Sequence, residues 1–314
     1  MPFMKLFFTF RLLPLFYLWA ALLPGQARAD SRIEPVPDAL ERWINLAPGL
    51  DMLELDLQKS PAGAGRSEIG IAPARSDLSG KQGNFIIIRS DPEKCSYSLH
   101  MASEDGQRCS LPERLQKHNL YAAINAGMFL PDNLKNTGFM RNATHVNNGR
   151  VVSNFGSFFL AGPRRAGLPQ AVILEKTGPE DKLTEKIADY NIVIQNYRLI
   201  SSAGDILWPE SADAYNISAL SADKQGRILF IFCGIPLSAA DFSRVLLALP
   251  LGINLTMYLE GGDQAGLALA LEKGNLNGSA GFLFWRGSHD AASSVSAFER
   301  TALPNVLGVL PKAE

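Results

Sequence analysis

The sequence is poor in the residues and motifs that most often mark a metal or nucleotide site. Its 314 residues include only three cysteines and four histidines, without zinc-finger spacing and without a G-x-x-x-x-G-K phosphate loop. No charge dominates, because the formal net charge is −1. The composition therefore excludes the basic excess that nucleic-acid binding uses. No motif in the sequence requires a cofactor.

Long apolar runs are also scarce, and the first lies at the N-terminus. The basic residues Lys5 and Arg11 precede an apolar run from Leu12 to Leu23, and small residues follow up to Ala29. This pattern is typical of a secretory signal peptide spanning residues 1–29. The run is short for a membrane span, although an uncleaved anchor is the alternative. We predict a periplasmic or secreted protein with no stable membrane span after cleavage.

The three cysteines fit an oxidising compartment. Cys95 and Cys109 flank a short polar segment, and we predict a disulfide between them that would contribute roughly 3 kcal/mol. Cys233 ends an apolar run that is typical of a core strand, so we expect a buried, unreactive thiol. A nucleophilic role for Cys233 is the alternative, but no cysteine-protease signature surrounds it.

The pattern of apolar residues predicts many short strands and few helices. Residues 30–84 form a lead-in with a first strand, Met52 to Leu57, and a flexible loop, 60–83, rich in Gly, Ser and Pro. Residues 85–314 form the main domain. Without regular βα alternation, the chain is expected to be a single α+β domain with an extended mixed β-sheet and a few packed helices.

Two local signals predict turns and caps in this domain. Asn147-Asn148-Gly149 favours a hairpin turn within Gly138 to Ser153. Ser238, three residues before Asp241, is expected to cap a helix whose apolar stripe packs into the core.

The most distinctive stretch is Glu260-Gly261-Gly262-Asp263, which ends an apolar run. A carboxylate at a strand end, with a second one three residues later, is a common place for acid–base chemistry. The two glycines permit positive φ and leave room for a ligand. A polar turn without chemistry is the alternative.

A second strand ends in the same way at Asn125. The run 121–124 is small and apolar, and Asn125 is followed closely by Gly127. An asparagine side chain can donate and accept hydrogen bonds together, so it can hold a sugar hydroxyl or orient a carboxylate. A turn asparagine is the alternative.

In this order, three motifs resemble the phosphodiester glycosidase domain family, which includes bacterial envelope proteins and the uncovering enzyme of the mannose-6-phosphate pathway. They are Asn125-Ala-Gly-Met-Phe129, Asn154-Phe-Gly-Ser-Phe-Phe159 and Leu259-Glu-Gly-Gly262. The resemblance extends from about Phe85 to Val309. It implies hydrolysis of the bond between a sugar and the phosphate of a sugar-1-phosphodiester, in an envelope or extracellular glycan.

The resemblance suggests roles for particular residues. Glu260 is predicted as the working carboxylate and Asn125 as its orienting or sugar-binding group, while Asp263 is a secondary acid. A divalent cation held by Glu260 and Asp263 is conceivable. The predicted substrate contacts are Gly127, Asn154, Gln195, Arg198, Gly261 and Gly262.

The chain departs from the family pattern at three places. Glu260 stands where Asp is more common, Gln195 is followed by Asn-Tyr-Arg198 instead of Ser-Gly-Pro, and Tyr215-Asn216 stands where an Arg is usual. Arg198 is a new cation that could bind phosphate.

These departures favour an alternative function, a carbohydrate-binding or envelope-assembly module that has lost turnover. A third possibility is an ordinary glycosidase with two carboxylates. Its partner acid would come from three loop residues, Asp132, Asp205 and Glu210.

Overall fold

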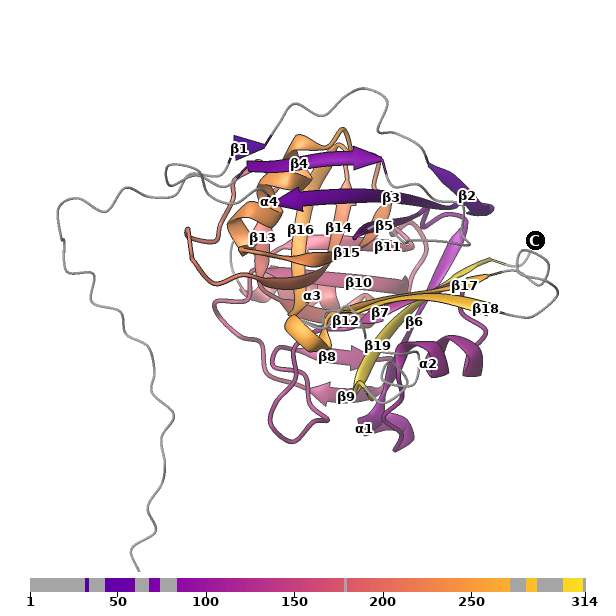
Figure 1. The fold of residues 1–314 in the computed structure, drawn as a ribbon. Helices are drawn as coiled ribbons and strands as arrows, with labels where there is room; N and C mark the ends of the chain where they lie inside the picture. Colours follow the sequence, from indigo (N-terminus) through magenta and orange to yellow (C-terminus); the bar gives the residue numbers. More distant parts are fainter. Residues whose placement is uncertain are drawn as a thin grey trace, which may run out of the picture.

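The computed structural model describes residues 32–33, 43–59, 68–73, 84–177, 180–271, 281–286 and 302–312. Strands dominate these residues, with four α-helices between them (Figure 1). The helices are α1 (Ala102–Asp105), α2 (Leu111–Lys117), α3 (Glu180–Ala188) and α4 (Ala239–Ala248). The predicted signal peptide lies outside the described residues, and none of the helices within them is long and apolar enough to cross a membrane.

The described strands form three sheets. The nine-stranded sheet has the order β1-β4-β3-β5-β15-β14-β16-β13, with β2 paired to β3. Its strands are β1 (Arg32–Ile33), β2 (Ile44–Ala47), β3 (Leu50–Lys59), β4 (Glu68–Pro73), β5 (Phe85–Ser90), β13 (Arg198–Ile200), β14 (Tyr215–Asp223), β15 (Ile228–Leu237) and β16 (Ile253–Gly261).

Two five-stranded sheets complete the fold, with the orders β11-β10-β12-β8-β9 and β18-β17-β7-β19-β6. The first contains β8 (Met140–Asn142), β9 (His145–Asn148), β10 (Ser157–Pro163), β11 (Ala171–Glu175) and β12 (Tyr190–Asn196). The second contains β6 (Cys95–Met101), β7 (Ala122–Asn125), β17 (Gly266–Leu271), β18 (Gly281–Arg286) and β19 (Asn305–Pro311). The predicted α+β class with few helices is confirmed, but the strands are divided among three sheets.

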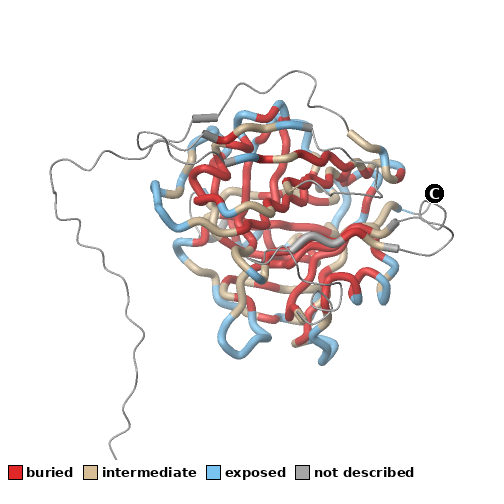
Figure 2. Tube along the Cα trace, in the orientation of Figure 1, coloured by how far each residue is buried: buried red, intermediate tan, exposed pale blue. Residues whose placement is uncertain are grey.

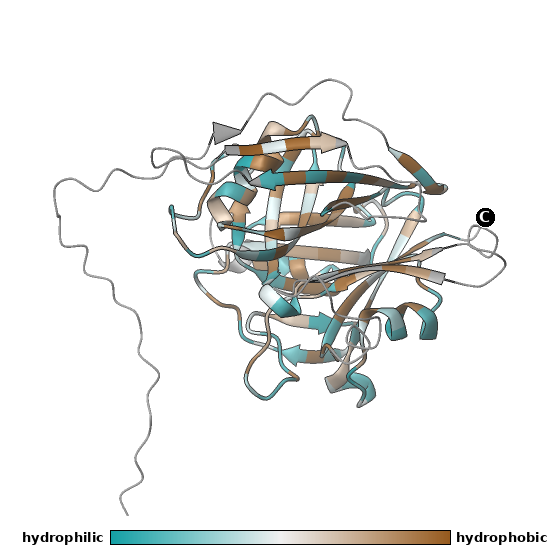
Figure 3. Cartoon of the chain, viewed as in Figure 1, coloured by the Kyte–Doolittle hydropathy of each residue, from teal (hydrophilic) through white to brown (hydrophobic). Residues whose placement is uncertain are grey.

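The central strands of the nine-stranded sheet are continuous apolar runs because both of their faces are covered. Side chains alternate between the two faces of a strand, and in β5 Ile86 and Ile88 join the core between the sheets, while Phe85 and Ile87 face the layer of α4. Figure 2 shows this buried interior, and Figure 3 shows hydrophobic segments along the same strands. A run that is apolar at every position therefore belongs in the middle of this sheet.

The lead-in contributes strands to the same sheet as the Glu260 motif. β3 pairs with β5, and β4 pairs with β3. β4 lies within the segment 60–83, where the sequence predicted only a flexible loop. Its register places Ile71 opposite Leu57, so pairing to β3 gives this Gly-rich segment a strand that its own composition does not indicate.

The helix ends follow their capping residues. Ser110 accepts a hydrogen bond from the backbone N–H of Glu113, and the Glu113 side chain accepts one from the backbone of Ser110. The Ser238 side chain accepts from the backbone N–H of Asp241 at 3.0 Å, which confirms the predicted cap of α4. The apolar stripe of α4, including Phe242, is buried in the core as predicted.

The hairpin signal at Asn147-Asn148-Gly149 was misleading. The hairpin is formed by β8 and β9, which place Asn142 opposite His145, so the chain turns at Ala143, with φ of +49°. Asn147 lies inside β9 and is buried. Its side chain accepts from the backbone N–H of Asn136 at 2.7 Å, so the asparagine holds a neighbouring loop instead of forming a turn.

The predicted disulfide between Cys95 and Cys109 is wrong. Along β19 and the residues before it, Cys95 lies opposite Pro311 and Cys109 lies opposite Leu303. Eight residues separate these partners, which corresponds to roughly 25 Å of extended chain, whereas a disulfide needs Cα atoms within about 7 Å. Both thiols are free.

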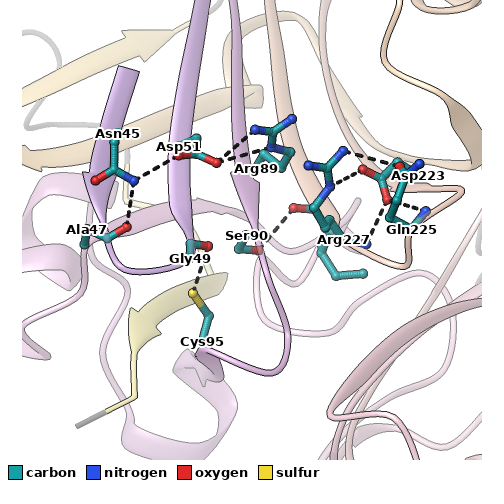
Figure 4. A network of polar contacts seen from close by, with 11 residues as sticks. Asn45, Ala47, Gly49, Asp51, Arg89, Ser90, Cys95, Asp223, Gln225 and Arg227 are labelled. Carbon is teal, nitrogen blue, oxygen red and sulfur yellow. Dashed lines mark hydrogen bonds and ion pairs between the residues drawn. The ribbon is translucent and has the colours of Figure 1, made fainter. Parts of the chain in front are cut away.

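The thiols of Cys95 and Cys233 both lie in buried environments. The Cys95 thiol instead donates to the carbonyl of Gly49 at 3.4 Å (Figure 4), and burial raises its pKa to about 11. Cys233 is fully buried, and burial raises its pKa to about 12. This confirms the predicted unreactive core thiol.

Candidate active site

The Glu260 motif lies where β16 leaves the nine-stranded sheet. Figure 1 shows β16 leading to a short helical turn, Gly262–Gln264, from which β17 departs toward another sheet. The pairing with β14 places Glu260 opposite Ser218 but Tyr258 opposite Ala219, so an extra residue bulges from β16 at Leu259. Bulges of this kind change the direction of side chains at strand ends and often occur beside active sites.

Glu260 is a partly buried carboxylate without a charged partner among the described residues. Within the described residues, its side chain accepts a hydrogen bond from the backbone N–H of Gly261, at 3.0 Å from Oε1. Burial raises the pKa of the carboxyl from 4.5 to about 7, and the Gly261 bond opposes this shift only in part. A carboxylate with a pKa near neutrality can exchange a proton during a reaction.

Two tyrosines surround the motif. The hydroxyls of Tyr215 and Tyr258 are hydrogen-bonded to each other, and burial raises the pKa of both, with a smaller contribution from the charge of Glu260. A Cβ at Gly261 would come within 2.5 Å of the Tyr258 hydroxyl and 2.6 Å of the Tyr215 ring. Gly261 is therefore required by the tyrosines that pack on it.

Gly262 has the other role expected of a glycine. Its φ is +66°, a left-handed conformation that favours glycine. No atom lies within 4 Å of the position its Cβ would take. The backbone after Glu260 is therefore open to an approaching ligand at Gly262, as the sequence suggested for the pair.

Asn125 is tied to the same turn from the neighbouring sheet. It ends β7, and its Oδ1 accepts a hydrogen bond from the backbone N–H of Gly266 at 3.2 Å. The side chain is 2% exposed, and its Nδ2 has no hydrogen-bond partner among the residues that the structure describes. The two predicted motifs therefore meet in space, but Asn125 lies behind the turn that follows Glu260, and its amide contacts backbone instead of a carboxylate.

The loop after Asn125 passes close to β12 and β16. A Cβ at Gly127, where φ is +130°, would come within 2.7 Å of Asn136 Oδ1 and 3.4 Å of Asn196 Nδ2. Asn196 in turn donates to the carbonyl of Leu259 at 3.1 Å, directly before Glu260. Gly127 thus allows the Asn125 loop to pack against the residues that hold the Glu260 bulge, which is a structural reason for this glycine.

Gln195 is placed differently from the prediction. It is fully buried, and its Nε2 donates to the carbonyls of Val152 and Phe155 at 2.7 and 2.9 Å. Its Oε1 accepts from the backbone N–H groups of Phe139 and Val152 at 3.2 and 2.9 Å. All of its hydrogen-bonding capacity is used to hold the loop before β10, so the structure gives Gln195 a supporting role in this loop.

Asn154 and Arg198 line a cavity of about 510 Å³. The exposed Asn154 precedes β10, and Arg198 begins β13. Arg198 forms an ion pair with Glu175, in which the two side chains are 22% and 17% exposed. The hydroxyl of Ser202 donates to the other oxygen of Glu175 at 2.5 Å. The charge that was expected to bind phosphate is therefore largely neutralised within the protein.

Asp263 is exposed in the first turn of the helical segment after Gly261. The described residues contain no group of three or more His, Cys, Asp or Glu side chains placed to hold a metal ion. A cation shared by Glu260 and Asp263 stays a prediction.

The loop acids considered as partners for Glu260 have local roles. Asp132 accepts from the backbone N–H groups of Leu134 and Lys135, both at 3.0 Å. Asp205 accepts from the Ser201 hydroxyl at 2.9 Å. The remaining candidate, Glu210, forms an ion pair with Arg244. These contacts explain the three acids without a second catalytic carboxylate.

The sequence did not identify the aromatic residues of this region. Tyr258 stands two residues before Glu260, and Tyr215 begins the strand that pairs with the end of β16. Trp208 lies on a connecting segment, with its ring centroid 5.4 Å from that of Tyr258. The closeness of Tyr258 to Glu260 in the sequence was the one available signal for an aromatic residue beside the motif. The positions of Tyr215 and Trp208 depend on tertiary structure.

Comparison with known proteins gives a family and a fold. The sequence profile described as phosphodiester glycosidase matches residues 118–310, more than half of the chain. No curated protein matches the sequence. The crystal structure of a hypothetical protein from Synechocystis is similar, with a TM-score of 0.53 and 13% identity, covering 86% of this chain and 63% of that one. This chain thus spans less than two thirds of that protein.

A second similar structure is a zebrafish enzyme. It is the catalytic domain of N-acetylglucosamine-1-phosphodiester alpha-N-acetylglucosaminidase, auto-inhibited by its pro-peptide. The TM-score is 0.55 at 14% identity, with 85% of each chain covered. At such identities the two structures show a shared fold, and the family rests on the profile match.

Proposed function

Because the chain belongs to the phosphodiester glycosidase family, we propose that it hydrolyses the bond between the anomeric carbon of a sugar and the phosphate of a sugar-1-phosphodiester. The observation that carries this proposal is Glu260: a partly buried carboxylate with a pKa of about 7, next to open space at Gly262. A structural carboxylate in such a position would be expected to have a cation beside it.

Glu260 acts as the general base in this proposal. Its ionised carboxylate takes a proton from a water molecule, whose oxygen attacks the anomeric carbon as the bond to the phosphate oxygen breaks. The phosphate leaves with the bonding electrons as a monoester of the second group. Because phosphate is a good leaving group, no second acid is required. The negative charge of Glu260 also stabilises the positive character that develops on the sugar ring.

Asn125 is a positioning residue in this scheme. Its bond to Gly266 fixes the segment that follows Glu260. Its Nδ2, without a hydrogen-bond partner in the described part of the chain, is the donor that this side chain has left for a water molecule or a sugar hydroxyl. Asp263, exposed on the same turn, is placed to contact the part of the substrate outside the site.

The substrate is proposed to be a phosphodiester-linked sugar of an envelope or extracellular glycan. The signal-peptide pattern in residues 1–29 supports a periplasmic or secreted location. The zebrafish enzyme of the same fold is described as acting on an N-acetylglucosamine-1-phosphodiester. An α-linked N-acetylglucosamine-1-phosphodiester is therefore the first compound to test.

A glycan-binding module without turnover is the second candidate. The observation that favours it is the pairing of Arg198 with Glu175, together with Tyr215 and Asn216 at the place where the family usually has an arginine. These features leave the phosphate without the cation that would normally hold it. This candidate predicts saturable binding without release of product.

Hydrolysis of the methyl diester of α-N-acetylglucosamine 1-phosphate separates the two candidates. We expect free N-acetylglucosamine and methyl phosphate from the wild-type protein and almost none from Glu260→Gln. Glu185→Gln, the same change on an exposed residue of α3, should keep full activity. Equal hydrolysis by wild type and Glu260→Gln would show that Glu260 is not the base, while binding without product would support the second candidate.

A further inference from the structure

The cavity beside the Glu260 motif has the composition of a sugar site. Its volume of about 510 Å³ falls within the range of roughly 300–1,000 Å³ that is typical of small-molecule sites. Two aromatic residues and one exposed amide contribute to its walls. The lining residues are Asn154, Gly156, Tyr197, Arg198, Leu207, Trp208 and Pro209.

A row of aromatic rings connects this cavity with the candidate active site. The ring centroids of Phe155 and Tyr197 are 4.2 Å apart, those of Tyr197 and Trp208 are 5.5 Å apart, and those of Trp208 and Tyr258 are 5.4 Å apart. The row ends at Tyr258, whose hydroxyl lies beside the motif of Glu260. A ligand seated on Tyr197 and Trp208 is therefore next to the residues that surround the carboxylate.

The backbone and side-chain contacts hold these rings in place. The indole N–H of Trp208 donates to the carbonyl of Arg198 at 3.2 Å. The carbonyl of Tyr197 accepts from the backbone N–H of Tyr258 at 2.9 Å and from the hydroxyl of Ser157 at 3.1 Å. Since these contacts fix Tyr197 and Trp208 before a ligand arrives, ligand binding costs little additional ordering of the two rings.

The charge of the cavity indicates which ligand it suits. Arg198, the cation among the described residues that line it, is paired with Glu175, so it offers a phosphate little net attraction. Asn154 is exposed and can both donate to and accept from a hydroxyl group. The faces of the aromatic rings carry partial negative charge and attract the C–H groups on the apolar face of a sugar ring.

We propose that this cavity binds a neutral sugar unit of the glycan, next to the phosphodiester that Glu260 cleaves. The sugar ring packs on Tyr197 and Trp208, and Asn154 binds one of its hydroxyl groups. The inference deepens the proposed function and rests on it for the position of the cleaved bond. The binding of the neutral sugar can be measured separately from hydrolysis.

An array of neutral, uronic-acid-containing and phosphorylated oligosaccharides tests the proposal with the purified protein. We expect the wild-type protein to retain neutral oligosaccharides, and the strongest of these then serves as the probe for dissociation constants. Trp208→Ala should weaken its binding at least 10-fold, while Trp208→Phe should recover most of the affinity because it keeps an aromatic face.

Trp43→Ala is the matched control, because the Trp43 indole lies against the Arg89 guanidinium, 3.7 Å from ring centroid to Cζ, and does not line the cavity. It should bind the probe as the wild type does. Asn154→Ala, a change on an exposed residue, should weaken binding about 3-fold and provides a test even if Trp208→Ala does not fold.

The proposal is overturned if no neutral oligosaccharide binds, if phosphorylated ones bind better than neutral ones, if Trp208→Ala and Asn154→Ala leave affinity unchanged, or if Trp43→Ala lowers it as much as Trp208→Ala does. Hydrolysis of the methyl diester reports on Glu260 independently. Active enzyme that binds no neutral glycan contradicts only this inference. Glycan binding through Trp208 without hydrolysis contradicts only the proposed function.

Discussion

The two ends of β14 and β16 hold carboxylates in opposite circumstances. At one end, Asp223 is buried but receives hydrogen bonds from the backbone of Gln225 and Arg227 and an ion pair from the Arg227 side chain (Figure 4). At the other end, Glu260 has one hydrogen bond from Gly261 and no ion pair among the described residues. The same two strands run between these ends, because Asp223 lies opposite Ile253 and Ser218 opposite Glu260.

This difference separates a carboxylate that serves the fold from the one that we propose as the general base. A buried charge that serves the fold is neutralised and hydrogen-bonded, since leaving it alone is costly. Among the described residues Glu260 has no cation to offset its burial, and burial raises its pKa to about 7. The fold thus tolerates a destabilised carboxylate at the place where it could work as a base, an arrangement that is typical of functional sites.

The largest expected effect comes from replacing each carboxylate by its amide. Glu260→Gln should lower kcat/KM for the sugar-1-phosphodiester roughly 10³-fold, as expected for the loss of a general base. Asp223→Asn should leave kcat/KM unchanged and lower the free energy of unfolding by about 1–2 kcal/mol, because an ion-paired hydrogen bond is lost. Steady-state kinetics and urea unfolding measure both. Equal loss of activity in the two variants would contradict the comparison.

The stability of Glu260→Gln should depend on pH. The pKa of Glu260 is raised in the folded protein, so its carboxyl contributes stability below pH 4.5 that is lost as pH rises through about 7. Compared with wild type, Glu260→Gln should become more stable over this interval, by roughly 2–3 kcal/mol at pH 8. Urea unfolding at several pH values measures the difference. A difference that is constant from pH 4 to 8 would be inconsistent with a buried, unpaired carboxylate.

The titration of His100 does not change the predicted stability difference between Glu260→Gln and wild type. Burial lowers its pKa to about 4, so acidification below pH 6.5 destabilises the fold. Its Nε2 is hydrogen-bonded to the Ser98 hydroxyl at 2.9 Å, and its ring stacks on His118 with centroids 3.7 Å apart. Because these contacts are the same in both proteins, the contribution of His100 cancels in the difference.

Breaking the ion pair between Arg227 and Asp223 should lower the stability of the fold without lowering kcat/KM. Arg227→Ala leaves the buried Asp223 carboxylate without its cation, and we expect the free energy of unfolding to fall by roughly 2 kcal/mol. Arg165→Ala is the control, because Arg165 pairs with Asp189 while 64% exposed, and such a pair contributes less than about 1 kcal/mol. If the two variants were equally stable, Asp223 would not depend on Arg227.

A smaller effect is expected from Gly261→Ala. The new Cβ would meet the Tyr258 hydroxyl and the Tyr215 ring, so the tyrosines or the strand end must shift. Overpacking of this kind costs roughly 1–3 kcal/mol, and the displaced Glu260 should lower kcat/KM about 10-fold. Gly226→Ala is a control on the turn beside Asp223, where φ is +80° and no atom lies within 4 Å of the new Cβ. It should reduce stability without reducing kcat/KM.

The sequence predicted local features well and long-range geometry less well. The cap at Ser238 and the apolar run of β15 that ends at Cys233 depend on neighbours in the chain. These features could therefore be predicted from the sequence. The separation of Cys95 from Cys109 is set by the register of β19, which no local pattern reveals.

The candidate site shows the same limit. The end of β16 at a carboxylate and two glycines could be predicted, and so could an asparagine at the end of β7. That Asn125 bonds to Gly266, that Gln195 is saturated by loop backbone, and that Glu175 neutralises Arg198 are contacts between segments far apart in the sequence. In each case the residue type indicated which chemistry the side chain could perform. The fold determined its contact partner, and that partner decides the role of the residue.

The pH dependence of kcat/KM for the methyl diester of α-N-acetylglucosamine 1-phosphate tests the central claim most directly. With Glu260 as a general base, kcat/KM should rise with pH through about 7, the pKa of its carboxyl, and level off above it. Glu260→Gln should show only residual activity without this rise. A wild-type profile that falls above pH 7, or that bends near 4.5 as an ordinary glutamate would, would contradict the account.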